Sequence, residues 1–160
     1  MDMISTSTML ILLSSLLLCS YQAETPGEIH SVPAEDDIRE IVLRRGGVDC
    51  MILRGDEIVL EGVVVGKFEG NQVRKGGSLI GEIRGEAFRH EGSDVWKLDR
   101  ANYYPGREIR LEGTIIGDIR SDGSIYRDGS TWGAAKPYDA STSETMRIMA
   151  ALYYFSTYFD

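Results

Sequence analysis

A repeat of 15–16 residues runs through the middle of the chain and limits the possible folds more than any other feature. Each copy has four landmarks: two apolar residues, a turn glycine and a third apolar residue. From the second landmark onward, successive copies lie 15, 15, 21 and 16 residues apart, so one copy carries an insertion. The copies are Leu53, Ile58, Gly62, Val65; Phe68, Val73, Gly77, Ile80; Ile83, Phe88, Gly92, Val95; Leu98, Ile109, Gly113, Ile116; and Ile119, Ile125, Gly129, Trp132.

The repeat predicts short β-hairpins. A copy is too short for a strand followed by a helix, and its apolar residues alternate with polar ones, as in GDIR (117–120) and SIYR (124–127). Turn pairs such as Asp122-Gly123 and Asp128-Gly129 tolerate positive φ and favour tight hairpins. One copy cannot bury its apolar side alone, so neighbouring copies must share a core. We therefore expect an all-β domain over residues 39–140, arranged as a solenoid or as a closed ring.

The best-preserved copy, at residues 117–133, resembles the repeat of the five-fold β-flower proteins, which are small exported bacterial proteins. The shared pattern is Gly-x-Ile-x-x-Asp-Gly-x-Ile-Tyr-x-x-Gly. The earlier copies match it loosely, since most have no counterpart of Asp122-Gly123 or Tyr126. The resemblance implies a pseudo-symmetric ring of five hairpins and brings no activity or functional residue with it. The units would lie near 51–66, 67–81, 82–96, 97–117 and 118–133.

Residues 141–160 have a different character and predict a helix. Ser141 and Glu144 have the spacing of a capping box, and ETMRIMAALYYFSTYF continues without glycine or proline. Apolar residues occupy nearly every side of this helix, so it must be buried, and it is too short to cross a membrane. We expect it to pack on the ring or to plug one end; an oligomer contact is the alternative.

Residues 1–23 are typical of an export signal. Their apolar run from Met9 to Cys19 is too short to span a bilayer and is followed by small and polar residues. Ala23 is the expected last residue removed, although the segment has no Lys or Arg before the apolar run. An amphipathic or buried N-terminal helix is the alternative.

We accordingly expect a secreted or extracytoplasmic protein of the cell envelope, with no transmembrane span in the mature chain. A lipid anchor at Cys19 is a less favoured option, because Leu18 stands where a small residue is required. Residues 24–38, polar with two prolines, read as a linker.

Composition and residue spacing point away from catalysis. The net charge of −8 disfavours broad attraction to nucleic acid. His30 and His90 have no spaced partners for a metal, and Cys50 has no visible catalytic framework. We therefore expect that the protein has no enzymatic activity, no cofactor and no metal site. The acids recur at turns, which indicates hairpin geometry: Glu61, Glu91, Glu112, Asp122 and Asp128.

The insertion between Leu98 and Ile109 is the candidate contact site. It carries Tyr103 and Tyr104 at the tip of a lengthened turn, with Trp96 and Arg107 nearby in sequence. Exposed aromatic side chains can stack on sugars or anchor a protein partner. The structural alternative is that both tyrosines fold back over the edge of the core.

These observations favour an exported, non-enzymatic structural or protein-interaction module. The alternative is a carbohydrate- or small-ligand-binding module that uses the aromatic loop at 99–108. A third possibility is a hydrolase whose turn carboxylates meet at one rim of the ring. The partner would be an unidentified protein or glycan.

Overall fold

The computed structural model describes residues 39–156 and 158, and within them the chain forms twelve strands and one helix. The expected signal segment, Cys19 and the linker 24–38 lie outside the described residues, as do positions 157, 159 and 160. In chain order the elements are β1 (Glu40–Arg45), β2 (Val48–Arg54), β3 (Glu57–Leu60), β4 (Val63–Glu69), β5 (Gln72–Lys75), β6 (Ser78–Arg84), β7 (Ala87–His90), β8 (Ser93–Arg100), β9 (Gly106–Leu111), β10 (Thr114–Arg120), β11 (Ser124–Arg127), β12 (Ser130–Lys136) and α1 (Thr142–Phe155).

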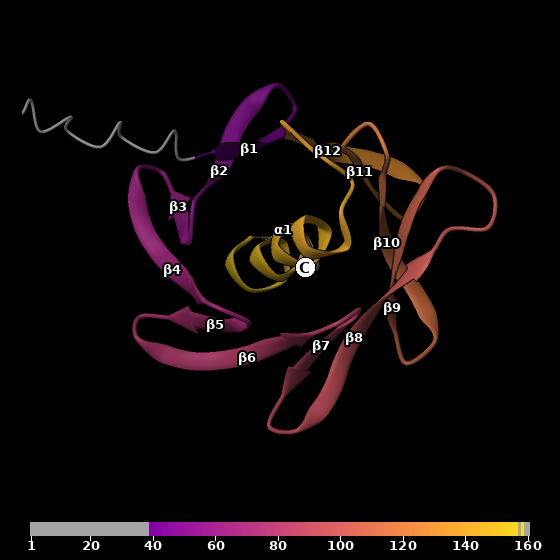
Figure 1. Ribbon diagram of the computed structural model, residues 1–160. Helices are drawn as coiled ribbons and strands as arrows, with labels where there is room; N and C mark the ends of the chain where they lie inside the picture. The colour runs from indigo at the N-terminus through magenta and orange to yellow at the C-terminus, as the bar shows by residue number, and fades with distance from the viewer. Residues whose placement is uncertain (1–38, 157, 159–160) are drawn as a thin grey trace, which may run out of the picture. The chain divides into compact units, whose positions relative to one another are not determined.

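The strands form one closed antiparallel ring around the helix. Each strand pairs with its neighbours in the sequence, and β1 pairs with β12 to complete the closure. Figure 1 looks along the axis of the ring, with α1 at its centre. The prediction of an all-β domain with a C-terminal helix is confirmed. Of the two arrangements expected for the domain, the structure has the closed ring and not the solenoid. Closure leaves no open strand edge.

The first two landmarks of each copy face one another inside the ring. They are direct partners on neighbouring strands, as Leu53 is with Ile58 and Phe68 with Val73. A sixth pair, Leu43 with Ala135, joins the two ends of the sheet. The ring therefore has twelve strands, two more than five hairpins supply. All twelve residues of these pairs are at most 9% exposed: Leu43, Ala135, Leu53, Ile58, Phe68, Val73, Ile83, Phe88, Leu98, Ile109, Ile119 and Ile125.

The last two landmarks shape the hairpins. In the β3–β4 turn, Gly62 has φ of 79° and Glu61 before it has φ of 50°, the two positive values that a type I′ turn needs. Val65 is the extra residue of a β-bulge, since the pairing jumps from Val64 to Gly66. Bulges at equivalent positions recur in the other five hairpins of this kind and bend the strands around the helix.

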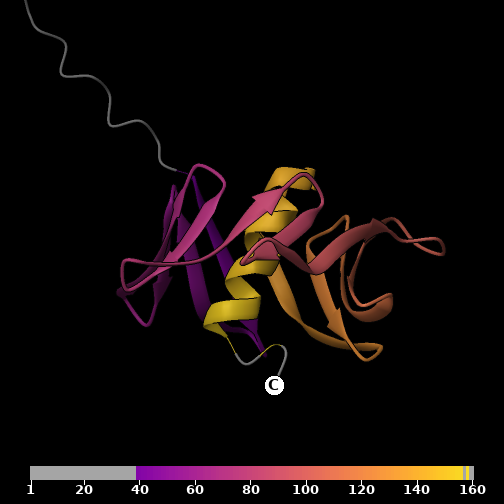
Figure 2. The same cartoon turned by 90° about the horizontal axis from the view of Figure 1, so that it is seen from below.

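The helix α1 runs through the ring, as the side view shows (Figure 2). The Ser141 hydroxyl accepts a hydrogen bond from the Glu144 amide at 3.2 Å, which caps the helix as the sequence predicts. Met146, Ile148, Met149 and Leu152 are completely buried, so the prediction of a buried helix is confirmed. Among residues 39–156 and 158, no helix is both long enough and apolar enough to cross a membrane.

Burial of the helix bears directly on the predicted oligomer contact. Nearly all of its apolar side chains lie inside the ring, where a second chain cannot reach them. Only Tyr153 and Tyr154 among its large apolar residues are partly exposed. An apolar oligomer contact through α1 would be restricted to the side chains of these two tyrosines.

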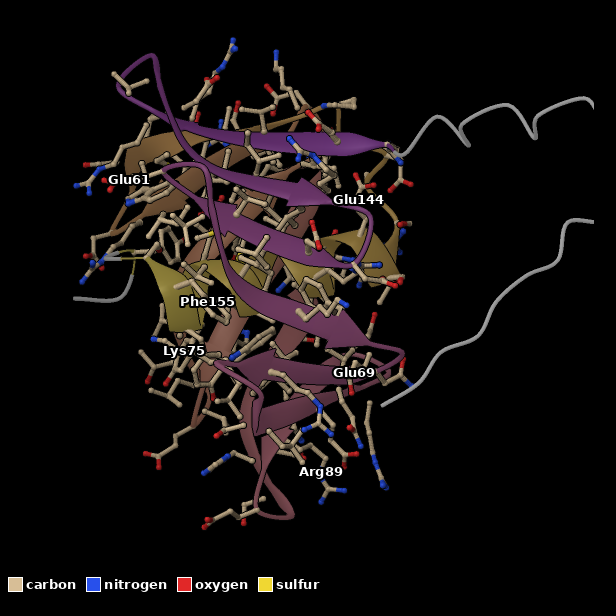
Figure 3. The ribbon with its side chains drawn as sticks, turned by 90° about the vertical axis from the view of Figure 1, so that its left-hand side faces the viewer. Glu61, Glu69, Lys75, Arg89, Glu144 and Phe155 are labelled. Carbon is tan, nitrogen blue, oxygen red and sulfur yellow. The ribbon has the colours of Figure 1, made fainter. Side chains whose placement is uncertain are left out.

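Alternate connections between strands lie at opposite ends of the ring and define two rims. The first rim carries the start of α1, where the Arg147 guanidinium donates to the Asp56 carboxylate at 3.1 Å. The second rim carries its end, where Lys75 Nζ donates to the Tyr154 carbonyl at 3.1 Å and lies 5.3 Å from the ring centroid of Phe155. Figure 3 shows Glu144 and Phe155 at these opposite ends. The insertion belongs to the first rim.

Candidate functional site

The insertion lengthens one hairpin of the ring without changing its register. Leu98 still faces Ile109, and the pairing continues outward to Arg100 and Arg107. β8 and β9 have eight and six residues, against seven and four in the β2–β3 hairpin. The loop at 101–105 consequently stands out from the wall of the ring (Figure 1). It is the longest connection between two strands on the first rim.

The two tyrosines of the loop point in different directions. Tyr103 is 93% exposed. Tyr104 folds back over the outer face of β10, where its hydroxyl interacts with the Asp118 carboxylate and the Arg120 guanidinium lies 5.2 Å from its ring centroid. Burial, together with the carboxylates of Asp118 and Glu108, raises the pKa of Tyr104 to about 12. Tyr104 thus fixes the loop, while Tyr103 is free to contact a partner.

A cleft of about 650 Å³ opens between the loop and the segment that leads into α1. Arg107 is held at its edge, since its guanidinium lies 2.7 Å from the Glu86 carboxylate and also donates to the Thr142 hydroxyl. A volume of this size suits a small molecule or a short segment of a larger one. We call it the insertion cleft; its lining residues are Glu86, Asp99, Arg100, Ala101, Tyr104, Pro105, Gly106, Arg107, Ser121, Tyr138 and Ala140.

The structure brings together only part of the predicted contact set. Tyr104 and Arg107 line the insertion cleft. Tyr103 projects from the same loop without lining the cleft. Trp96 does not join them: it is 1% exposed, and its ring stacks on Phe88 at a centroid distance of 5.4 Å and an interplanar angle of 10°.

The place of Trp96 in the repeat explains its burial. The equivalent position in the neighbouring hairpins is Gly81 or Gly117, where a side chain would point into the ring. Trp96 therefore fills the interior and packs near Tyr153 of the helix, at a centroid distance of 6.3 Å. Its nearness to the insertion in sequence gave no information on this inward orientation.

Sequence reasoning did not single out several of the lining residues, among them Glu86, Arg100 and Tyr138. A signal for Arg100 was present, because counting two residues outward from the Leu98–Ile109 pair reaches Arg100 on one strand and Arg107 on the other. Glu86 lies in the β6–β7 turn, which the repeat could have placed on the same rim as the insertion. Tyr138 had no comparable signal, since its position depends on how the chain crosses from β12 into α1.

The insertion cleft is lined by charged, polar and aromatic groups. Its lining offers guanidinium donors, carboxylate acceptors and two tyrosine rings, and includes no histidine or cysteine. Within the part of the chain that the structure describes, no three His, Cys, Asp or Glu residues gather as a metal site would need. No protein-family model, no curated protein and no solved structure matches the chain.

Proposed function

We propose that this chain is a non-enzymatic binding module that recognises a protein partner through the β8–β9 insertion. The observation that carries the proposal is the 93% exposure of Tyr103 on a loop that is otherwise well anchored. Tyr104, held by Asp118 and Arg120, fixes the base of that loop and lowers the entropy lost on binding. Tyrosine is among the residues that most often dominate the energy of protein interfaces.

A second candidate function is the binding of a carbohydrate or another small ligand in the insertion cleft. Its support is the volume of about 650 Å³ and the presence of Tyr104 and Tyr138 beside charged side chains in the lining. Ligand sites commonly combine apolar walls with a few polar groups that fix orientation. Here the exposed Tyr103 would flank the ligand without being its main anchor.

The wider setting of this function is also a proposal. The apolar run in residues 1–23 supports export to an extracytoplasmic compartment. The repeat at 117–133 supports a relationship to the β-flower proteins, with β12 and β1 adding a sixth unit to the five hairpins. In this arrangement the ring is a scaffold, and the single insertion is the element that distinguishes one side from the others.

A cross-linked pull-down from the native envelope or secreted fraction tests the main proposal. The intact chain is compared with Tyr103→Ala and with a variant in which residues 101–105 are replaced by a two-residue turn. Leu79→Ala is the matched control, since Leu79 is a 51% exposed apolar residue on the opposite rim. We expect a partner that both loop variants lose and the control retains. Equal capture by all four proteins would contradict recognition through the insertion.

A further inference from the structure

Two successive pairs of like charges face each other across β8 and β9. Asp99 is the direct partner of Glu108, and the next pair outward is Arg100 with Arg107. Like charges in this relationship destabilise a sheet. In the β2–β3 hairpin the outermost pair is of opposite charge, Arg54 with Glu57. The β4–β5 hairpin also contains one like-charge pair, Lys67 with Arg74, so the lengthened hairpin is distinguished by having two such pairs in succession.

Three of these four charged side chains lie within 4 Å of a group of opposite charge. The Arg110 guanidinium lies 3.4 Å from the Asp99 carboxylate and 2.6 Å from the Glu108 carboxylate. Arg107 lies 2.7 Å from Glu86. Arg100 is different, because its side chain forms no hydrogen bond or ion pair with any of residues 39–156 or 158. Its exposed side chain lines the insertion cleft.

We propose that Arg100 and Arg107 together bind an anionic group, a carboxylate or a phosphate, on a ligand in the insertion cleft. This inference rests on the second candidate function, ligand binding in that cleft. A guanidinium presents a planar fork of donors that matches either anion. Arg107 is fixed in place by Glu86 and Thr142, and Arg100 supplies a positive charge that has no partner among the described residues.

The rest of the lining fits the body of such a ligand. Tyr104, Pro105 and Tyr138 offer apolar surface beside the two arginines, and the Ser121 side chain adds a polar group. Glu86 and Asp99 also line the cleft, but each already faces a guanidinium, of Arg107 and Arg110 respectively. An anion placed between Arg100 and Arg107 would also relieve the repulsion between them, so its binding should stabilise the fold.

Titration calorimetry on the intact chain tests this inference with three probes: inorganic phosphate, glucuronate and glucose. The first two carry the proposed anion in different forms, and glucose is the uncharged match of glucuronate. We expect phosphate or glucuronate to bind and glucose to bind at least about tenfold more weakly. We expect Arg100→Gln to lower the affinity for the anion at least about tenfold, which corresponds to the loss of one charged hydrogen-bonding group. Binding of phosphate alone would identify a phosphorylated ligand, and binding of glucuronate alone an acidic sugar.

The matched control is Arg54→Gln, which removes the same charge from β2 on the far side of the ring (Figure 1). It should leave the affinity unchanged. Arg100→Gln should melt at the same temperature as the intact chain or higher, because it removes the repulsion with Arg107. An intact chain that binds neither anion, or that binds glucose equally well, would overturn the inference, as would an equal loss in both arginine variants. Those outcomes leave the pull-down with Tyr103→Ala unaffected, so failure of the anion site and failure of the protein-interaction proposal can be told apart.

Discussion

Phe155 of the helix packs directly against the backbone of Gly66 in β4. A Cβ atom at Gly66 would lie 2.6 Å from Phe155 Cε1 and 2.9 Å from the carbonyl oxygen of Arg74. On another side of the ring of strands, Gly117 faces the aromatic side chain and hydroxyl of Tyr158 in the same way. Because Gly66 and Gly117 have no side chains, the ring of strands can close tightly around the C-terminal segment inside it.

Replacement of Gly66 by alanine should therefore destabilise the protein. We expect a loss of about 1–3 kcal/mol in the free energy of unfolding, typical of an overpacked core. Urea unfolding measures this loss. If the contact with Phe155 causes it, the penalty of Gly66→Ala should shrink in a Phe155→Ala background. An equal penalty in both backgrounds would assign the strain to the Arg74 carbonyl instead.

Removal of residues 141–160 should unfold the ring. The deletion takes away Met146, Ile148, Met149 and Leu152, which are all completely buried, and each is worth roughly 1.5–3 kcal/mol. Together they approach the total stability of an ordinary domain, about 5–15 kcal/mol. Circular dichroism on heating should show no cooperative transition in the truncated chain. A melting temperature equal to that of the full chain would mean that the strands hold together without the helix.

Trp96 should behave as a core residue in mutagenesis. We expect Trp96→Ala to cost about 3–5 kcal/mol, because its ring stacks on Phe88 inside the ring of strands. Capture of a partner by the folded variant should be unchanged, whereas Tyr103→Ala should show the reverse pattern, with normal stability and lost capture. Loss of capture in a fully folded Trp96→Ala protein would return Trp96 to the contact set.

The repeat predicted most of the fold because each landmark answers a local physical requirement. The paired apolar residues need burial, the turn glycine needs positive φ, and the fourth landmark is the bulge that bends the strand. The same spacing also marks a sixth copy, since Leu43, Gly47 and Cys50 have the offsets of Ile58, Gly62 and Val65. That copy was missed because its remaining partner, Ala135, lies at the other end of the domain and meets Leu43 only when the ring closes.

The candidate site was less accessible to sequence reasoning. The sequence predicted the insertion, and it left open whether the two tyrosines are exposed or fold back over the core. The different directions of Tyr103 and Tyr104 depend on Asp118 and Arg120, which come from a strand beyond the loop. The separation of Trp96 from Arg107 depends on the inward orientation of one strand position. Contacts between distant parts of the chain decided the first outcome, whereas the second follows from the place of Trp96 in the repeat.

The buried tyrosines should make the protein lose stability in alkali. Burial raises the pKa of Tyr104 and of Tyr154 to about 12, from an ordinary value of 10.0. Burial also raises the pKa of Tyr158. The fold favours the neutral hydroxyls, so the unfolded chain releases their protons first as the pH rises. Their contribution to stability is complete below about pH 10 and should be lost progressively between about pH 10 and 12.

Melting temperatures measured from neutral pH to about pH 11 should fall steeply above about pH 10. Tyr104→Phe should start lower at neutral pH, because it loses the interaction of the hydroxyl with Asp118, but its melting temperature should fall less steeply in alkali. Tyr154→Phe should also flatten the curve. Tyr103→Phe is the control, since its exposed ring has no hydroxyl partner among the described residues, and it should follow the intact protein. Unchanged slopes in both test variants would mean that these hydroxyls ionise without opposing the fold.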